Sequence, residues 1–207
     1  SAASDVYKRQ VEGYYLVGLL AKEFLQKYPG SKIMYDPRLI WNTEAIIKQY
    51  GGKGIRCKSG HAFMKQCMRE NDVIYGGEMS SHHYFRSFTC CDSGMITALL
   101  VTGIVCAAGK QLSELVGSME EAFPCSGEIN REVQNGAQIF AVLQEKYSNG
   151  SFDTLDGLSI AFSDWRFNLR ASNTEPVIRL NVETRGDRAL LKEKTEELLQ
   201  LIGGNPA

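Results

Sequence analysis

The chain has 207 residues, of which 43% are hydrophobic and 23% are charged, and these proportions are typical of a folded globular protein. They exclude the disordered, collagen-like and low-complexity classes. The formal net charge is −1, so the chain lacks the excess positive charge that binding to duplex nucleic acid or to an anionic membrane surface requires. We therefore expect neither nucleic acid nor a membrane among its partners.

The location of the protein is predicted from two further features. No apolar run approaches the ~20 residues of a membrane span, and Ser1–Gln10 is polar where a signal peptide would be apolar. The six cysteines lack the spacing of a disulfide scaffold and stand at positions 57, 67, 90, 91, 106 and 125. Together these features predict a cytoplasmic protein with reduced thiols.

Helical and extended patterns alternate through the first half of the chain. Apolar spacing and Gly or Pro stops predict helices over 11–28, 41–50, 61–69 and 93–108, and strands over 32–35, 54–57 and 72–76. Such alternation is typical of an α/β domain with a mixed, mainly parallel sheet covered by helices. Ligand sites in such domains lie at the carboxyl ends of the strands.

The pattern changes near Gly117, and the charge balance changes with it. Residues 1–117 hold 14 basic and 10 acidic side chains, whereas residues 118–207 hold 9 and 14. The second part predicts a strand over 128–133, a helix over 135–147, two alternating strands near 165–170 and 178–183 that we expect to be half-buried, and a helix after Gly186. We therefore predict two domains, 11–117 and 118–207, the second a small α+β domain with an antiparallel sheet.

The loop between the two alternating strands carries a concentration of anion-binding groups. Arg170 offers a planar fork of donors, and Ser172, Asn173 and Thr174 follow it within four residues. A guanidinium with neighbouring hydroxyls and turn amides is typical of a phosphate site. The competing interpretation is a polar β-turn whose Ser and Asn serve turn geometry alone.

A second group of polar residues follows the strand predicted over 72–76. Glu78 can accept hydrogen bonds from two vicinal sugar hydroxyls, while Ser80 and His82 add donors. The glycines before them allow close backbone approach. The competing interpretation is that an acidic residue here is a surface residue or a helix cap.

All three histidines, at positions 61, 82 and 83, lie within a short stretch, with Cys90 and Cys91 close behind. Their spacing matches no standard zinc pattern, and adjacent histidines rarely bind one ion, so we predict no metal site. His61 stands at the start of a predicted helix. It could serve as a proton shuttle, as a hydrogen-bond donor or as a cap.

Two motifs carry a family resemblance. Gly77-Glu78-Met79-Ser80-Ser81-His82 resembles the Gly-Glu-x-Ser-Gly-His sugar loop of the α-D-phosphohexomutases, and the segment 170–176 resembles their Arg-x-Ser-Asn/Gly-Thr-x-Pro phosphate loop. Met79 and Asn173 are more similar to the phosphomannomutase/phosphoglucomutase branch. The resemblance assigns residues 11–117 to the family's third domain and 118–207 to its fourth domain, which has a TATA-binding-protein-like fold.

The resemblance also implies roles for matching residues. Glu78 and Ser80 would read the sugar hydroxyls, with His82 supporting them. The phosphate that is not being transferred would be held by Arg170, Ser172, Asn173 and Thr174. His61 matches an active-site histidine of the family, and Arg38 stands where relatives commonly carry a lysine near the reacting phosphate, so both are candidate catalytic residues. Ser81 replaces the usual glycine.

The family's phosphoserine loop and magnesium loop are not found in this chain. The resemblance places both loops in preceding domains, which also supply the Mg²⁺ cofactor. We therefore predict the C-terminal half of a mutase that interconverts hexose 6-phosphate and hexose 1-phosphate through a bisphosphate, with Ser1–Gln10 as an appended end. The expected ligands are mannose and glucose phosphates, in the branch that supplies GDP-mannose, and the expected partner is the missing N-terminal half.

Two alternatives differ from this prediction. The chain could be a stand-alone, non-catalytic module that binds sugar phosphates. It could also be an unrelated nucleic-acid or protein-interaction domain, which the net charge and the lack of basic runs disfavour.

Overall fold

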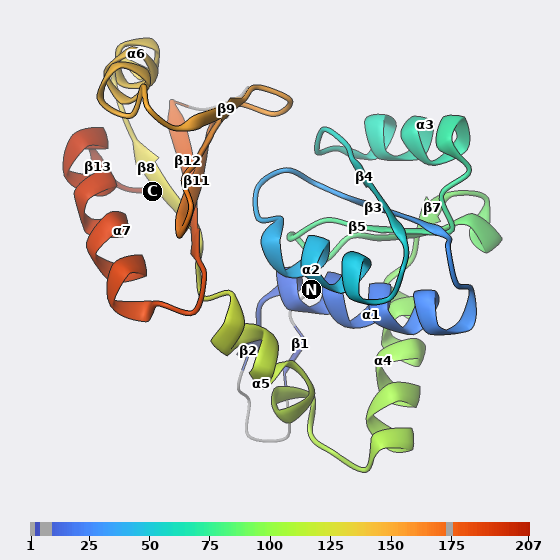
Figure 1. The fold of residues 1–207 in the computed structure, drawn as a ribbon. Coiled ribbons are helices and arrows are strands. Elements are labelled where there is room, and N and C mark those ends of the chain that lie inside the picture. The colour runs from blue at the N-terminus through green and yellow to red at the C-terminus, as the bar shows by residue number, and fades with distance from the viewer. Residues whose placement is uncertain (1–2, 5–9, 173–175) are drawn as a thin grey trace. The chain divides into compact units, whose positions relative to one another are not determined.

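The fold is described from a computed structural model, which covers residues 3–4, 10–172 and 176–207. The chain divides into two compact units, Ser1–Glu121 and Ala122–Ala207 (Figure 1). Helix α5 (Leu112–Ala122) runs through Gly117, so the division falls at the end of this helix.

The first unit is built on a five-stranded sheet in the order β4-β3-β5-β6-β7. Strands β4 (Lys53–Arg56), β3 (Lys32–Tyr35) and β5 (Tyr75–Gly77) are parallel, as the alternating pattern predicted. Strands β6 (His83–Phe85) and β7 (Cys91–Asp92) extend the sheet in antiparallel fashion and were not predicted. Such short strands show too few residues for an alternating pattern to be visible.

The described residues of this unit form five α-helices, and four of them were predicted within a few residues of their observed ends. They are α1 (Gly13–Lys27), α2 (Trp41–Gln49), α3 (His61–Asn71), α4 (Gly94–Ala108) and α5. Helix α4 begins at its N-cap Ser93, whose Oγ accepts a hydrogen bond from the Ile96 amide, and ends at Gly109, which adopts a left-handed conformation. The remaining short elements are β1 (Ala3–Ser4), β2 (Gln10–Val11) and a 3₁₀ turn, η1 (Arg86–Phe88).

The core of the first unit fixes the sheet against its helices. The Phe24 ring of α1 stacks on the Tyr75 ring of β5 with centroids 4.9 Å apart. Met64 and Met68 of α3 pack in a cluster with Met34 of β3. These contacts hold the carboxyl ends of β3, β4 and β5 at one edge of the sheet, where the candidate site residues follow.

The second unit has a six-stranded sheet in which every pairing is antiparallel, as predicted. The order is β13 (Asn205–Pro206), β8 (Cys125–Glu132), β12 (Val177–Thr184), β11 (Trp165–Ala171), β10 (Leu158–Ala161) and β9 (Ser151–Asp153). Helices α6 (Gly136–Lys146) and α7 (Arg188–Ile202) complete the unit, and both contribute to one core with the sheet. Leu143, Phe167 and Leu198 are fully buried in it.

The two central strands differ from their prediction in one respect. Their apolar residues alternate as expected, but most of the polar residues between them are also buried: Arg166, Asn168, Asn181 and Glu183. Arg170 and Arg179 are partly exposed. Arg166 and Glu183 form an ion pair of 2.7 Å, and Asn168 donates hydrogen bonds to the Asp156 carbonyl and to Ser159. The expectation of half-buried strands was therefore wrong at these four buried positions, because paired polar groups can be buried where single ones cannot.

Among the described residues, no single helix is long and apolar enough to cross a membrane. Helices α4 and α5 reach that length and composition only together, and they bend by 95° at their junction.

Candidate functional site

The candidate site of the first unit lies at the carboxyl edge of its parallel strands. Glu78 directly follows β5, Arg38 lies in the loop after β3, and His61 begins the helix that follows β4. Parallel strands bring their carboxyl ends to one edge, so residues far apart in sequence meet there. Five predicted residues are linked by contacts in this region: Arg38, His61, Glu78, Ser80 and His82.

The carboxylate of Glu78 is held from both sides although it is almost fully buried. The Tyr84 hydroxyl donates to Oε1 at 2.7 Å. Ser80 Oγ donates to Oε2 at 3.4 Å, and the Arg38 guanidinium lies 3.5 Å from the same oxygen. Burial, followed by this hydrogen bond to Glu78, raises the pKa of Tyr84, so the phenol keeps its proton and remains a donor.

Asp36 connects the loop after β3 with the loop after β5. Its carboxylate accepts hydrogen bonds from the Arg38 amide at 3.0 Å, from the Arg38 guanidinium at 2.8 Å and from the Met79 amide at 2.7 Å. Arg38 also reaches Ser80 Oγ at 3.2 Å. Arg38 is only 4% exposed, so in this structure its charge supports the carboxylates of the loop.

The backbone of the loop is a tight turn. The Glu78 amide donates to the His82 carbonyl, and the Ser81 amide donates to the Glu78 carbonyl, both at 2.9 Å. Ser81 therefore adopts a φ of 65°, a conformation that favours glycine. Helix α1 approaches this turn closely at Gly13, where a Cβ atom would collide with the Met79 carbonyl.

Asp92 joins the two exposed histidines. His61 Nδ1 lies 3.2 Å from Oδ1 of Asp92, and His82 Nδ1 lies 3.2 Å from Oδ2. The two rings meet edge to face with centroids 4.7 Å apart. Partial burial raises the pKa of Asp92, but the hydrogen bond from His82 and the proximity of His61 outweigh it and hold the pKa below its usual value.

The third histidine is separate from this group. His83 is buried in β6, where its Nδ1 shares a hydrogen bond of 2.7 Å with the Tyr75 hydroxyl. Burial, followed by the charge of His82, lowers the pKa of His83 to about 4, so its ring is neutral near pH 7. His82 lies in the loop before β6 and contacts Asp92, whereas His83 lies in the strand and contacts Tyr75, so the two histidines have different partners.

The predicted phosphate loop belongs to the second unit. The Ser172 amide donates to the Val177 carbonyl at 2.8 Å and closes the loop between β11 and β12. Asn173 and Thr174 lie outside the described residues. Arg170 is partly exposed, and its guanidinium lies 3.3 Å from Asp156 and 3.9 Å from Glu128.

Gly157 allows the neighbouring turn to approach Arg170. It has a φ of 79°, and a Cβ atom there would collide with the Leu169 carbonyl of β11. This close approach places the adjacent Asp156 beside the guanidinium, which is thereby oriented.

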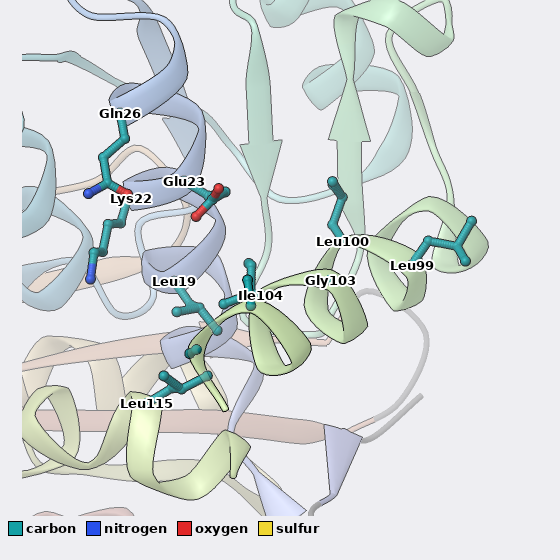
Figure 2. Close-up of a pocket in the computed structure, with 11 residues that line it drawn as sticks. Leu19, Lys22, Glu23, Gln26, Leu99, Leu100, Gly103, Ile104 and Leu115 are labelled. Atoms are coloured by element: carbon teal, nitrogen blue, oxygen red, sulfur yellow. The ribbon is translucent and has the colours of Figure 1, made fainter. Parts of the chain in front are cut away.

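A pocket of about 460 Å³ lies elsewhere in the first unit, between α1 and α4 (Figure 2). Leu19, Leu100 and Ile104 line its apolar side, while Lys22, Glu23 and Gln26 of α1 lie at its polar side. None of the predicted site residues lines it.

The sequence reasoning missed several acidic or phenolic residues of these sites, among them Asp36, Tyr84, Asp92 and Asp156. Asp36 and Tyr84 stand within two residues of a predicted site residue, which is a weak signal. Asp92 and Asp156 carry no signal of their own, because their contacts depend on how strands and turns pack.

The chain matches a known family over most of its length. Residues 12–123 match "Phosphoglucomutase/phosphomannomutase, alpha/beta/alpha domain III", and residues 128–201 match "Phosphoglucomutase/phosphomannomutase, C-terminal domain". A phosphomannomutase of Escherichia coli is 56% identical over 194 residues, which are 93% of this chain and 42% of the relative. Phosphohexose mutases of Xanthomonas campestris are 52% identical over 198 residues, 95% of this chain and 44% of the relative.

A solved structure agrees with these relatives. The crystal structure of a phosphoglucomutase/phosphomannomutase family protein from Burkholderia thailandensis has a TM-score of 0.77 at 26% identity. The match covers 96% of this chain and 44% of that protein. The chain thus spans less than half the length of the proteins it matches.

Proposed function

Because the chain belongs to the phosphoglucomutase/phosphomannomutase family, we propose that it is the sugar- and phosphate-binding half of a mutase that interconverts hexose 6-phosphate and hexose 1-phosphate. The observation that carries this proposal is the cluster around Glu78. A carboxylate held by Tyr84, Ser80 and Arg38 at the carboxyl edge of a parallel sheet is pre-organised to accept hydrogen bonds from sugar hydroxyls.

The residues of the first unit divide into two roles. Glu78 and Ser80 contact the sugar, and His61 and His82, which are about half exposed and are held by Asp92, support this contact. Arg38 acts as a positioning residue, because its guanidinium is already engaged with Asp36, Glu78 and Ser80. Its proposed part in the reaction is to orient the Glu78 carboxylate.

The second unit supplies the grip on the phosphate. Arg170, Ser172, Asn173 and Thr174 bind the phosphoryl group that is not being transferred. In the absence of phosphate, Asp156 and Glu128 hold the Arg170 guanidinium in place. A planar fork suits this role, because it can bind a phosphate at either end of the sugar through two parallel hydrogen bonds.

The reacting groups of the mutase belong to the remainder of the longer protein in this proposal. That remainder carries the phosphoserine and the Mg²⁺ ion. His61, His82 and Asp92 do not suit Mg²⁺, which prefers oxygen ligands in octahedral geometry. Mannose and glucose phosphates are the proposed ligands and GDP-mannose supply the proposed role, while the cytoplasmic location stays a prediction.

A charge-conserving substitution tests the phosphate grip. Arg170→Lys should weaken the binding of mannose 1-phosphate by about 1 to 3 kcal/mol, because the charge remains while the bidentate fork is lost. Isothermal titration calorimetry gives the affinity. The matched control is Arg188→Lys, the same change after the opposite end of β12, which should leave the affinity unchanged. Equal affinities for wild type and Arg170→Lys would reject the assignment.

A second substitution tests the sugar contact. Glu78→Gln should weaken mannose 1-phosphate binding but leave inorganic phosphate binding intact, since only the sugar contact changes. Amide NMR titration of the labelled chain follows both ligands at residues 76–83 and 170–175. Equal losses for the two ligands would mean that the substitution disturbs the fold rather than the recognition of the sugar.

The alternative function is a stand-alone module that binds sugar phosphates without turnover. The titrations described above would show binding of sugar phosphates both for the mutase half and for the stand-alone module. The two proposals differ in whether the remaining half of a mutase restores activity when it is added.

A further inference from the structure

Three side chains from three different elements converge at one point of the first unit. His61 is the first residue of α3, His82 lies in the loop after β5, and Asp92 ends β7. One ligand atom from each lies within 4.8 Å of the other two. Residues this far apart in sequence match no spacing motif, which is why the sequence predicted no metal site here.

The distances suit a shared ion. Each histidine Nδ1 lies 3.2 Å from an oxygen of Asp92. Zinc binds imidazole nitrogen and carboxylate oxygen at about 2.0 to 2.2 Å, so two ligands of a tetrahedral ion stand about 3.3 to 3.6 Å apart. Small rotations of these side chains would therefore open enough space for the ion between them.

The chemistry of the three groups selects the class of ion. Two imidazoles and one carboxylate suit zinc and similar divalent transition metals rather than Mg²⁺ or Ca²⁺. The side chains of His61, His82 and Asp92 are 51%, 45% and 26% exposed, so an ion can enter from solvent and keep water ligands. We propose that His61, His82 and Asp92 form a three-ligand site for a divalent transition-metal ion of the zinc class, with its other coordination positions open.

Lys65 is the competing charge at this site. Its Nζ lies 3.9 Å from Oδ1 of Asp92, where it offsets part of the negative charge that attracts the ion. Lys65→Gln should therefore tighten metal binding severalfold. The proposed metal site depends only on the positions of His61, His82 and Asp92. It does not require that the chain bind sugar phosphates.

The test is a titration of the metal-free chain with Zn²⁺ and with Co²⁺. Calorimetry measures the affinity, and the NMR signals of the histidine rings report which side chains bind the ion. We expect one ion per chain. Changes in partners outside the ligand shell typically alter metal affinity about 10- to 100-fold, so loss of a ligand in His82→Gln or Asp92→Asn should weaken binding by at least about tenfold. Asp72→Asn is the matched control, because Asp72 pairs with Arg86 in the same unit, and it should bind as the wild type does.

The cysteine thiols are the main competing ligands, and Co²⁺ distinguishes them. Coordination by nitrogen and oxygen gives visible bands without an intense sulfur-to-metal charge-transfer band in the near ultraviolet. Affinity that is unchanged in both His82→Gln and Asp92→Asn, or a thiolate band that disappears in Cys91→Ser, would overturn the proposal. Amide spectra that match the wild type establish that each variant is folded.

Discussion

Ser81 shows how a single residue of the sugar loop can be strained by the turn that it completes. Its φ of 65° lies in the left-handed region, where a side chain other than glycine is disfavoured by about 1 kcal/mol or more. The turn requires this conformation because Glu78, Ser81 and His82 are joined by two backbone hydrogen bonds. A glycine at this position would remove the strain.

Ser81→Gly should therefore raise the free energy of unfolding by about 0.5 to 1 kcal/mol, as the steric relief exceeds the added entropy of the unfolded chain. Urea unfolding measures the change. Ser113→Gly is the control, because the same substitution within helix α5 should lower stability. A decrease for both variants would contradict the strain at Ser81.

At the scale of elements, an N-cap hydrogen bond and an ion pair between two helices contribute to the stability of the second unit. Helix α7 begins at Asp187, whose Oδ1 accepts a hydrogen bond of 2.8 Å from the Leu190 amide. Further along α7, Glu197 contacts Lys146 of α6 at 2.7 Å and Lys194 at 2.9 Å. The Asp187 contact satisfies an amide at the start of α7 that has no partner within the helix. The contact between Glu197 and Lys146 joins α7 to α6 through an ion pair.

Asp187→Ala should lower the free energy of unfolding by about 1 kcal/mol, because the Leu190 amide loses its acceptor. Asp187→Asn keeps an acceptor oxygen and should remain close to the wild type. Thermal unfolding followed by circular dichroism compares the two. A loss in Asp187→Asn as large as that in Asp187→Ala would show that charge, and not capping, is responsible.

The Glu197 contacts should make stability depend on pH. Hydrogen bonds from Lys146 and then Lys194 lower the pKa of Glu197 to about 2 from an ordinary value of 4.5. Because the folded pKa is the lower one, the stabilisation is present above pH 4.5 and is lost as the pH falls toward 2. Both partners are partly exposed, so it is worth at most about 1 kcal/mol.

Glu197→Gln should therefore be less stable than the wild type at pH 7, and the difference should shrink as the pH approaches 2. Urea unfolding at pH 7, 4 and 2 measures it. Glu196→Gln, on an exposed pair with Lys192, should match the wild type throughout. A Glu197→Gln deficit that persists at pH 2 would rule out the ion pair as its cause.

At the scale of the whole molecule, the chain spans 42 to 44% of the length of two relatives that it matches. This fraction affects whether the chain can catalyse a reaction by itself. Phosphoryl transfer depends on positioning and on charge stabilisation at the reacting phosphate. In the proposed function the groups that react belong to the rest of the longer protein. In the same proposal, the described units supply the groups that bind the sugar phosphate.

The purified 207-residue chain should consequently show no mutase activity with mannose 1-phosphate and a bisphosphate activator, although we expect it to bind sugar phosphates. A coupled assay measures turnover, and a full-length mutase relative is the positive control. Activity clearly above a substrate-free blank would contradict the division of roles.

Much of this protein follows from its sequence alone. Short-range apolar spacing predicted four helices of the first unit, and alternation predicted β11 and β12, because both patterns depend on neighbours within a few residues. The amino-acid sequences of segments 77–82 and 170–176 identified the family, because each motif is likewise contained within a few neighbouring residues. Glu78, Ser80 and Arg170 could be selected as candidate site residues before any fold was known.

The tertiary structure alone decided which side chains meet. Arg38 reaches Glu78 across 40 positions because parallel strands bring their following loops to one edge. Asp92 joins His61 to His82 from the antiparallel part of the same sheet. The burial of Arg166 against Glu183 likewise depends on the register between two strands. Such contacts arise from packing between distant segments, and packing of this kind leaves no periodic or local pattern in the sequence.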